Sequence, residues 1–103
     1  MWPSWYSPPR PSHNAGADDV IRTVAQFYHI SPADIRGGQR NRLYVDARWV
    51  CAEALRRKGR LSFPAIGRLL NRDHTTVMHG CREFDNAASY RPEMKRALRL
   101  ALR

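Results

Sequence analysis

The sequence predicts an all-α fold of about six helices. Three observations support this class. Apolar residues recur three and four positions apart in successive segments, which is the spacing of one face of a helix. Residues that begin or end helices, mainly serine, aspartate, proline and glycine, separate these segments. No stretch alternates apolar and polar side chains over the length of a strand.

The first 17 residues differ in composition from the rest of the chain. They hold four of the seven prolines together with three serines, so we expect residues 1–17 to form an extended, disordered tail. The helical domain is expected to span residues 18–103. Three aromatic side chains of the tail could form a short anchor that a partner protein buries, or could rest on the domain surface. These side chains are Trp2, Trp5 and Tyr6.

Two helices are expected in the first part of the domain. Asp18 or Asp19 can cap a helix that runs to about Tyr28. Its apolar stripe consists of Val20, Ile21, Val24, Ala25 and Tyr28. The run Ser31-Pro32-Ala33-Asp34 then combines an N-cap serine, a first-turn proline and an acidic third residue, which predicts a short helix that ends at Gly37-Gly38.

Two further helices are predicted later in the chain. One is predicted from about Asn41 to Lys58, with Arg56-Arg57-Lys58 at the negative end of its dipole and Gly59 after it. Its inward stripe consists of Val45, Trp49, Ala52 and Leu55. The last predicted helix runs from about Pro92 to Leu102 and is amphipathic, with basic side chains on its outer face.

A helix-turn-helix is predicted at the centre of the domain, at about residues 62–88. Ser62 can cap the first helix, and Asn71 suits the left-handed residue that ends it. Asp73 can cap the second helix, which runs to about Ala88. The inward positions are Ile66, Leu69 and Leu70 in the first helix and Val77, Cys81 and Phe84 in the second.

Positive charge is concentrated in the predicted domain. The chain carries 18 basic and nine acidic side chains, a net charge of +9. Residues 1–35 hold two basic and three acidic groups, so residues 36–103 hold 16 and six, a local net charge of +10. This excess favours a polyanionic partner. The 16 arginines against two lysines could also reflect genomic base composition.

Several classes of protein are not expected. The sequence has no glycine-rich phosphate loop, no apolar run long enough to span a membrane and no secretory leader. We therefore expect a soluble, cytoplasmic protein that associates with the nucleoid and needs no cofactor. Cys51 and Cys81 are too few for a disulfide framework and are expected to be buried. A zinc site from these cysteines, His74 and His79 would lack any recognised ligand spacing.

Polar residues gather where the second helix of the helix-turn-helix begins. In this motif the second helix enters the major groove and reads base edges with its first residues. His74 can bond to bases or phosphate, Thr75 offers a methyl and a hydroxyl, and Asp73 can accept from the amino group of cytosine. Asp73 can equally serve as a helix cap only. A catalytic role of the Asp73 and His74 pair would need a third positioned group, so no enzymatic activity is expected.

The run from Arg72 to His79, RDHTTVMH, resembles the signature of the C-terminal DNA-binding domain of DnaA, the bacterial chromosomal replication initiator. Upstream segments match this family in order and near its spacing. They are Val24–Tyr28, Ile30–Ile35, Arg40–Arg42, Ala47-Arg48 and Leu61–Gly67. The resemblance covers about residues 20–88 and implies a helix-turn-helix of the Trp-repressor type.

The resemblance also implies a set of DNA contacts. The residues that match Asp73, His74 and Thr75 read bases in the major groove of an asymmetric DnaA box, roughly TTATNCACA. The arginine that matches Arg40 enters the A·T-rich minor groove. The positions that match contacts with the DNA backbone are Arg48, Arg56, Pro64, Thr76 and His79.

Three departures from the family pattern affect these expectations. Asn71 stands where the family usually has glycine. Trp49 stands where a polar residue is usual, and we expect it either in the core or stacked against a sugar. The family domain is normally attached to an AAA+ ATPase that this chain lacks, so we expect a protein that binds the box without opening an origin.

The principal hypothesis is a stand-alone, monomeric protein that binds double-stranded DNA at DnaA-box-like sites and modulates replication initiation or transcription by occupying them. It would compete with the full-length initiator or help it to load. One alternative is a protein adaptor of full-length DnaA or another replication protein, acting through the aromatic tail or the basic final helix. Another is a helix-turn-helix transcription regulator with an unrelated site.

Overall fold

The computed structural model describes residues 11–103, and it describes side chains from residue 16 onward. This part of the chain is all-α, as predicted, with six helices and no strand. The helices are α1 (Pro11–Tyr28), α2 (Pro32–Arg36), α3 (Arg42–Lys58), α4 (Phe63–Leu70), α5 (His74–Tyr90) and α6 (Glu93–Ala101). None of these helices is long and apolar enough to cross a membrane.

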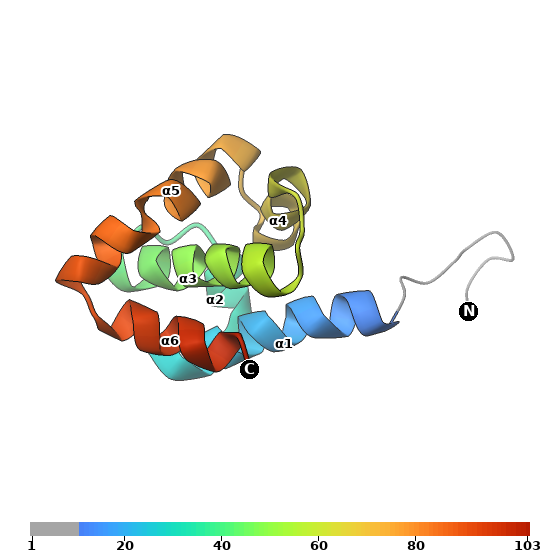
Figure 1. Cartoon of the computed structure of the whole chain (residues 1–103), viewed down its shortest axis with the longest axis horizontal. Helices are drawn as coiled ribbons and strands as arrows, with labels where there is room; N and C mark the ends of the chain where they lie inside the picture. The colour runs from blue at the N-terminus through green and yellow to red at the C-terminus, as the bar shows by residue number, and fades with distance from the viewer. Residues whose placement is uncertain (1–10) are drawn as a thin grey trace, which may run out of the picture.

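Helix α3 is the centre of the arrangement and contacts each of the other five helices. Figure 1 shows α4 and α5 on one side of α3, and α1 and α6 on the other. Every helix contributes to one core, and the core side chains of α2 to α6 include the fully buried Ile35, Val50, Ile66, Phe84 and Met94. Through this core the helix-turn-helix of α4 and α5 packs against α3.

Helix α1 begins earlier than the sequence predicted. It starts at Pro11 and not at Asp18 or Asp19, so the start of the helical part was placed too late. Proline fits the first turn of a helix, since its missing N–H would have no partner there. The next proline is Pro32, so no proline interrupts the helix before it ends at Tyr28. Residues 1–10, including the proposed anchor, lie outside the described residues.

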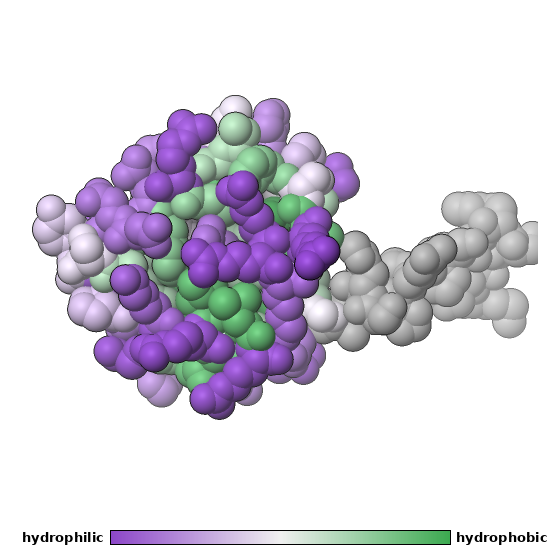
Figure 2. Space-filling model, in the orientation of Figure 1, coloured by the Kyte–Doolittle hydropathy of each residue, from purple (hydrophilic) through white to green (hydrophobic). Residues whose placement is uncertain are grey.

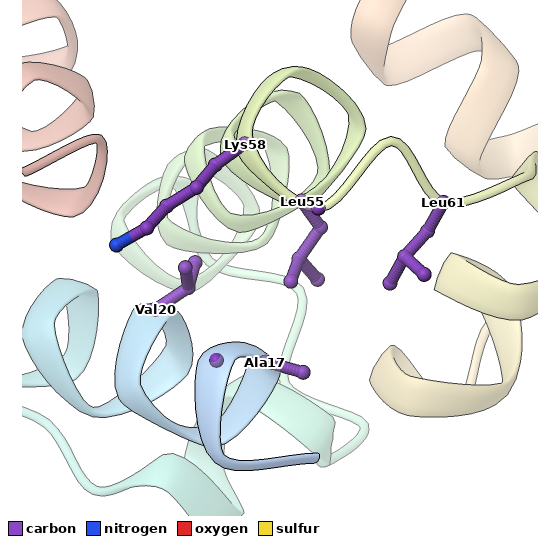
Figure 3. A pocket seen from close by; sticks show the side chains of 7 residues that line it. Ala17, Val20, Leu55, Lys58 and Leu61 are labelled. Atoms are coloured by element: carbon purple, nitrogen blue, oxygen red, sulfur yellow. The ribbon is translucent and has the colours of Figure 1, made fainter. Parts of the chain in front are cut away.

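The first part of α1 packs against the end of α3. Figure 3 shows Ala17 and Val20 of α1, Leu55 of α3 and Leu61 of the following loop around a common space. This space has a volume of about 240 Å³. Lys58 extends along the edge of this space. Ala17 and Val20 are buried, so α1 is part of the domain from at least this point.

Local signals placed the other helices well. Ser31 and Asp34 form the predicted capping box, with N–H to side-chain distances of 3.0 and 3.1 Å. Asn41 and Ser62 accept from the backbone N–H groups of Tyr44 and Ala65. Helix α5 extends slightly past the expected end near Ala88, and α6 lies within its expected range.

Figure 2 shows a patch of apolar surface framed by long hydrophilic side chains where α3 and α6 lie. A groove between α3, α5 and α6 has Phe84, Leu98 and Leu102 as its apolar lining. Its charged lining residues are Arg57, Lys95, Arg99 and Asp85. Arg57 is paired with Glu53 at 2.7 Å. Lys95, Arg96 and Arg99 of α6 are exposed, so the outer face of this helix is basic, as predicted.

Candidate nucleic-acid interface

The turn between α4 and α5 is tight because two residues allow it. Asn71 has φ 56° and ψ 48°, the left-handed conformation predicted for it. The N–H of Arg72 donates to the carbonyl of Gly67 at 2.8 Å. A side chain at Gly67 would place its Cβ only 2.5 Å from the Arg72 carbonyl oxygen. Gly67 was matched to the family by sequence, but its part in the turn was not predicted.

The start of α5 is exposed and ordered by its own side chains. Asp73 is the N-cap, and its carboxylate accepts from the backbone N–H of Thr75 at 3.3 Å. The Thr75 hydroxyl donates to the same carboxylate. His74 Nδ1 lies 3.6 Å from Asp73 Oδ1. The cap predicted for Asp73 is confirmed, and its contact with a base stays a prediction.

These bonds also fix the charge of Asp73. The hydrogen bond from the Thr75 hydroxyl is the largest cause that lowers the pKa of the Asp73 carboxyl below its usual value of 3.8. The nearby His74 lowers it further. Asp73 is therefore ionised at neutral pH, and α5 begins with a carboxylate acceptor beside an exposed imidazole.

The structure gathers most of the predicted contact residues around α4 and α5. Pro64, Asp73 and His74 line one open groove of about 500 Å³. The guanidinium of Arg56 lies 4.7 Å from the centre of the Phe63 ring, which holds it beside the start of α4. The exposed members of the predicted set are Arg40, Arg56, Pro64, Asp73, His74, Thr75, Thr76 and His79.

Arg48 differs from the other predicted contacts because it is buried, with 6% of its surface exposed. Its Nε donates to the carbonyl of Ile35 at 2.7 Å. Its Nη2 donates to the carbonyls of Gly37 and Gln39 at 2.9 and 2.6 Å. Arg48 therefore holds the loop that carries Arg40, a role that the sequence did not reveal. Its contact with the DNA backbone stays a prediction.

Arg72 shares this task from the other side of the loop. Its Nη2 also donates to the carbonyl of Gly37, and its Nη1 donates to the carbonyl of Asn71 at 2.8 Å. Burial, and secondarily the charge of Arg72, lower the pKa of the Arg48 guanidinium. Within residues 16–103, neither arginine has a carboxylate within ion-pair distance. Two positive charges thus meet here without a counter-ion from the described side chains.

Trp49 connects α3 to the outer side of α5. Its ring is half-buried, and its edge meets the His79 ring at a centroid distance of 5.8 Å and an angle of 81°. A Cβ added at Gly80 would lie 2.6 Å from Trp49 Cδ1. Gly80 is therefore the residue that makes room for the indole. An isolated glycine inside a helical pattern is the only sequence signal of this contact.

The cysteines carry no sign of a site. Cys51 is buried as predicted, whereas Cys81 is only half-buried. Burial raises the pKa of the Cys81 thiol to about 11, and the neighbouring Glu53 raises it as well. Among the described side chains, no group of three or more His, Cys, Asp or Glu residues is placed to hold a metal ion.

Comparison with known proteins identifies the family. The family model described as "Bacterial dnaA protein helix-turn-helix" matches residues 17–83. Relatives described as chromosomal replication initiator protein DnaA include that of Herpetosiphon aurantiacus, which is 49% identical over 65 residues, 62% of this chain and 14% of the relative. Those of Neisseria meningitidis serogroup C and Gloeobacter violaceus are 38% and 32% identical over 76% and 89% of this chain.

The matched stretch covers only 15% and 21% of the length of these last two relatives. The stretch that the family model matches lies over the helices described above, from within α1 through most of α5. The chain therefore belongs to the family of bacterial DnaA helix-turn-helix domains.

Proposed function

We propose that this chain binds double-stranded DNA sequence-specifically, at DnaA-box-like sites, and modulates replication initiation by occupying them. The observation that carries the proposal is the start of α5, where Asp73, His74 and Thr75 are exposed and held in place by a cap and a tight turn. Such a helix start reads base edges when it lies in a major groove.

The supporting contacts follow from the placement of charge. Arg40 lies in the loop held by Arg48 and Arg72, and we assign it to the minor groove beside the major-groove site. Contacts with the DNA backbone position the domain without reading sequence. We assign these to Arg48, Arg56, Pro64, Thr76 and His79. The local excess of positive charge adds a salt-dependent, sequence-independent attraction.

Fluorescence anisotropy with two labelled duplexes tests the proposal. One duplex carries a single DnaA box, and the other carries the same bases in scrambled order. At physiological salt we expect the box to bind at least about a thousandfold more tightly, as specific sites usually do. Equal affinity for the two duplexes would overturn the proposal. Selection of bound sequences from a random duplex pool then separates DnaA-box recognition from an unrelated target site.

We further propose that the domain acts as a monomer, because a DnaA box is asymmetric and presents one half-site for one α5. Sedimentation of the domain with an equimolar box duplex measures the stoichiometry. We expect one protein chain per duplex, and two chains per single box would contradict this. Addition of full-length DnaA to the same duplex distinguishes competition from joint loading, since competition lowers initiator occupancy and joint loading raises it.

A further inference from the structure

A recess of about 180 Å³ lies between α3 and the start of α5. Its lining is mostly apolar, with Ala52, Val77 and the Trp49 ring among its walls. Its polar edge consists of Arg48, Arg72 and Thr76. The recess is therefore large enough to hold several waters or one small ring. The proposed function assigns Arg48 and Thr76 to the DNA backbone but gives the apolar part of the recess no role.

The wall formed by Trp49 is fixed in position. The indole lies against the backbone of Gly80 so closely that a methyl group there would overlap it. The His79 ring packs across its edge. Aromatic side chains held from two sides cannot turn into the recess and fill it. The recess is thus a lasting feature of the surface beside Thr76 and His79, two side chains assigned to the DNA backbone.

The polar edge of the recess is positively charged and suits an anion. Arg48 and Arg72 converge on the carbonyl of Gly37, and no carboxylate of the described part of the chain neutralises either of them. Arg48 is also buried, which makes its uncompensated charge costly. A phosphate at this edge would relieve the repulsion between the two guanidinium groups and accept from the hydroxyl of Thr76.

We propose that the recess receives the deoxyribose of one nucleotide of the bound duplex, with the adjoining phosphate on Arg48, Arg72 and Thr76. The inference rests on the proposed DNA binding and assigns one of its contacts. A deoxyribose carries a methylene at C2′ that suits the apolar walls. A ribose would place its 2′-hydroxyl against Trp49, Ala52 and Val77, where it has no hydrogen-bond partner.

Ribonucleotide scanning of the box duplex tests the assignment. Each position of both strands is replaced in turn by its ribonucleotide, and the affinity of each duplex is measured by anisotropy. At one position, where the sugar enters the recess, we expect a loss of about tenfold, the usual cost of an unpaired buried hydroxyl. The same position with 2′-fluoro, which keeps the ribose-like pucker but cannot donate, should bind as the parent duplex does.

Variants of Trp49 connect the loss to the recess. Trp49→Gln removes the apolar wall and offers a polar partner, so the tenfold penalty at that position should disappear. Trp49→Phe keeps an apolar wall and should keep the penalty. The matched control is Tyr90→Ala, which removes an aromatic side chain with 76% of its surface exposed at the far end of α5. Its scan should equal that of the wild type.

A second readout needs no change at Trp49. The chain has three tryptophans, so Trp2→Phe/Trp5→Phe leaves Trp49 as the only one. Iodide should quench its emission less when the box duplex is bound. The assignment is overturned if no position shows a penalty that depends on Trp49, if 2′-fluoro is penalised equally, or if quenching is unchanged. Failure of the wild type to prefer the box would instead overturn the proposed function.

Discussion

Two arginine environments, both beside the first half of α3, differ in one respect. Arg91, at the end of α5, donates to Asp46 at 2.6 Å, and the Asp46 side chain is only 3% exposed. Arg48 donates only to backbone carbonyls and meets a second arginine, Arg72. The first charge is neutralised by Asp46, whereas the second has no carboxylate partner among residues 16–103. Charge pairing thus separates a structural arginine from one that faces the proposed ligand.

The largest expected effect comes from breaking the neutralised pair. Asp46→Ala leaves Arg91 partly buried without its counter-ion, and we expect it to lower the free energy of unfolding by about 3 kcal/mol. Urea denaturation measures this loss. Asp85→Ala, an exposed acidic position on α5, is the control and should change stability by less than about 0.5 kcal/mol. The contrast between the two arginines fails if Asp46→Ala weakens box binding of the folded protein.

The next effect comes from the arginine without a counter-ion. Arg48→Ala removes three hydrogen bonds, leaves the carbonyls of Ile35 and Gln39 without this donor and frees the loop of Arg40, so stability should fall by about 2 kcal/mol. Box affinity should fall by a similar amount. Arg40→Ala tests the loop separately, since Arg40 is exposed and should lose affinity without losing stability. If Arg48→Ala reduced stability alone, the loop would not serve DNA binding.

A smaller effect separates base reading from backbone attraction. His74→Ala should weaken box binding by about 1–2 kcal/mol and leave binding to the scrambled duplex unchanged, which relaxes specificity. Arg56→Ala should weaken both duplexes alike and reduce the slope of log affinity against log salt by about one. Anisotropy titrations at several salt concentrations measure both quantities. If His74→Ala weakened both duplexes alike and Arg56→Ala weakened only the box, the roles assigned to the two residues would be reversed.

The smallest effect concerns the cap of α5. The folded pKa of Asp73 is lowered, so the cap stabilises the fold fully above the usual carboxyl pKa of 3.8 and is lost as pH falls through the lower folded value. Asp73→Ala should lower Tm at neutral pH, and its difference from the wild type should shrink in acid. Asp73→Asn retains the capping oxygen and should keep most of the stability. A Tm difference that grows in acid would contradict the sign.

The elements that rest on neighbouring residues could be predicted from the sequence. Ser31, Ser62 and Asp73 cap helices as expected, and Asn41, near which a helix was expected to begin, is the cap of α3. Asn71 adopts the expected left-handed conformation. A cap or a turn is decided by a side chain and backbone groups two or three positions away, so the information is local. The late placement of the α1 start came from extending the proline-rich composition of residues 1–9 through residue 17.

The all-α class, the helix-turn-helix, the polar start of α5 and the net positive charge follow from the sequence alone. Three features depend on how the helices pack. Arg48 and Arg72 hold the loop of Arg40, Gly80 makes room for Trp49, and Arg91 pairs with Asp46 while Arg48 has no carboxylate partner among residues 16–103. These features join residues as far as 45 positions apart in the chain. Spacing along a helix reveals which side chains share a face, but it does not show which side chains of another helix they contact, because those contacts form only when the helices pack.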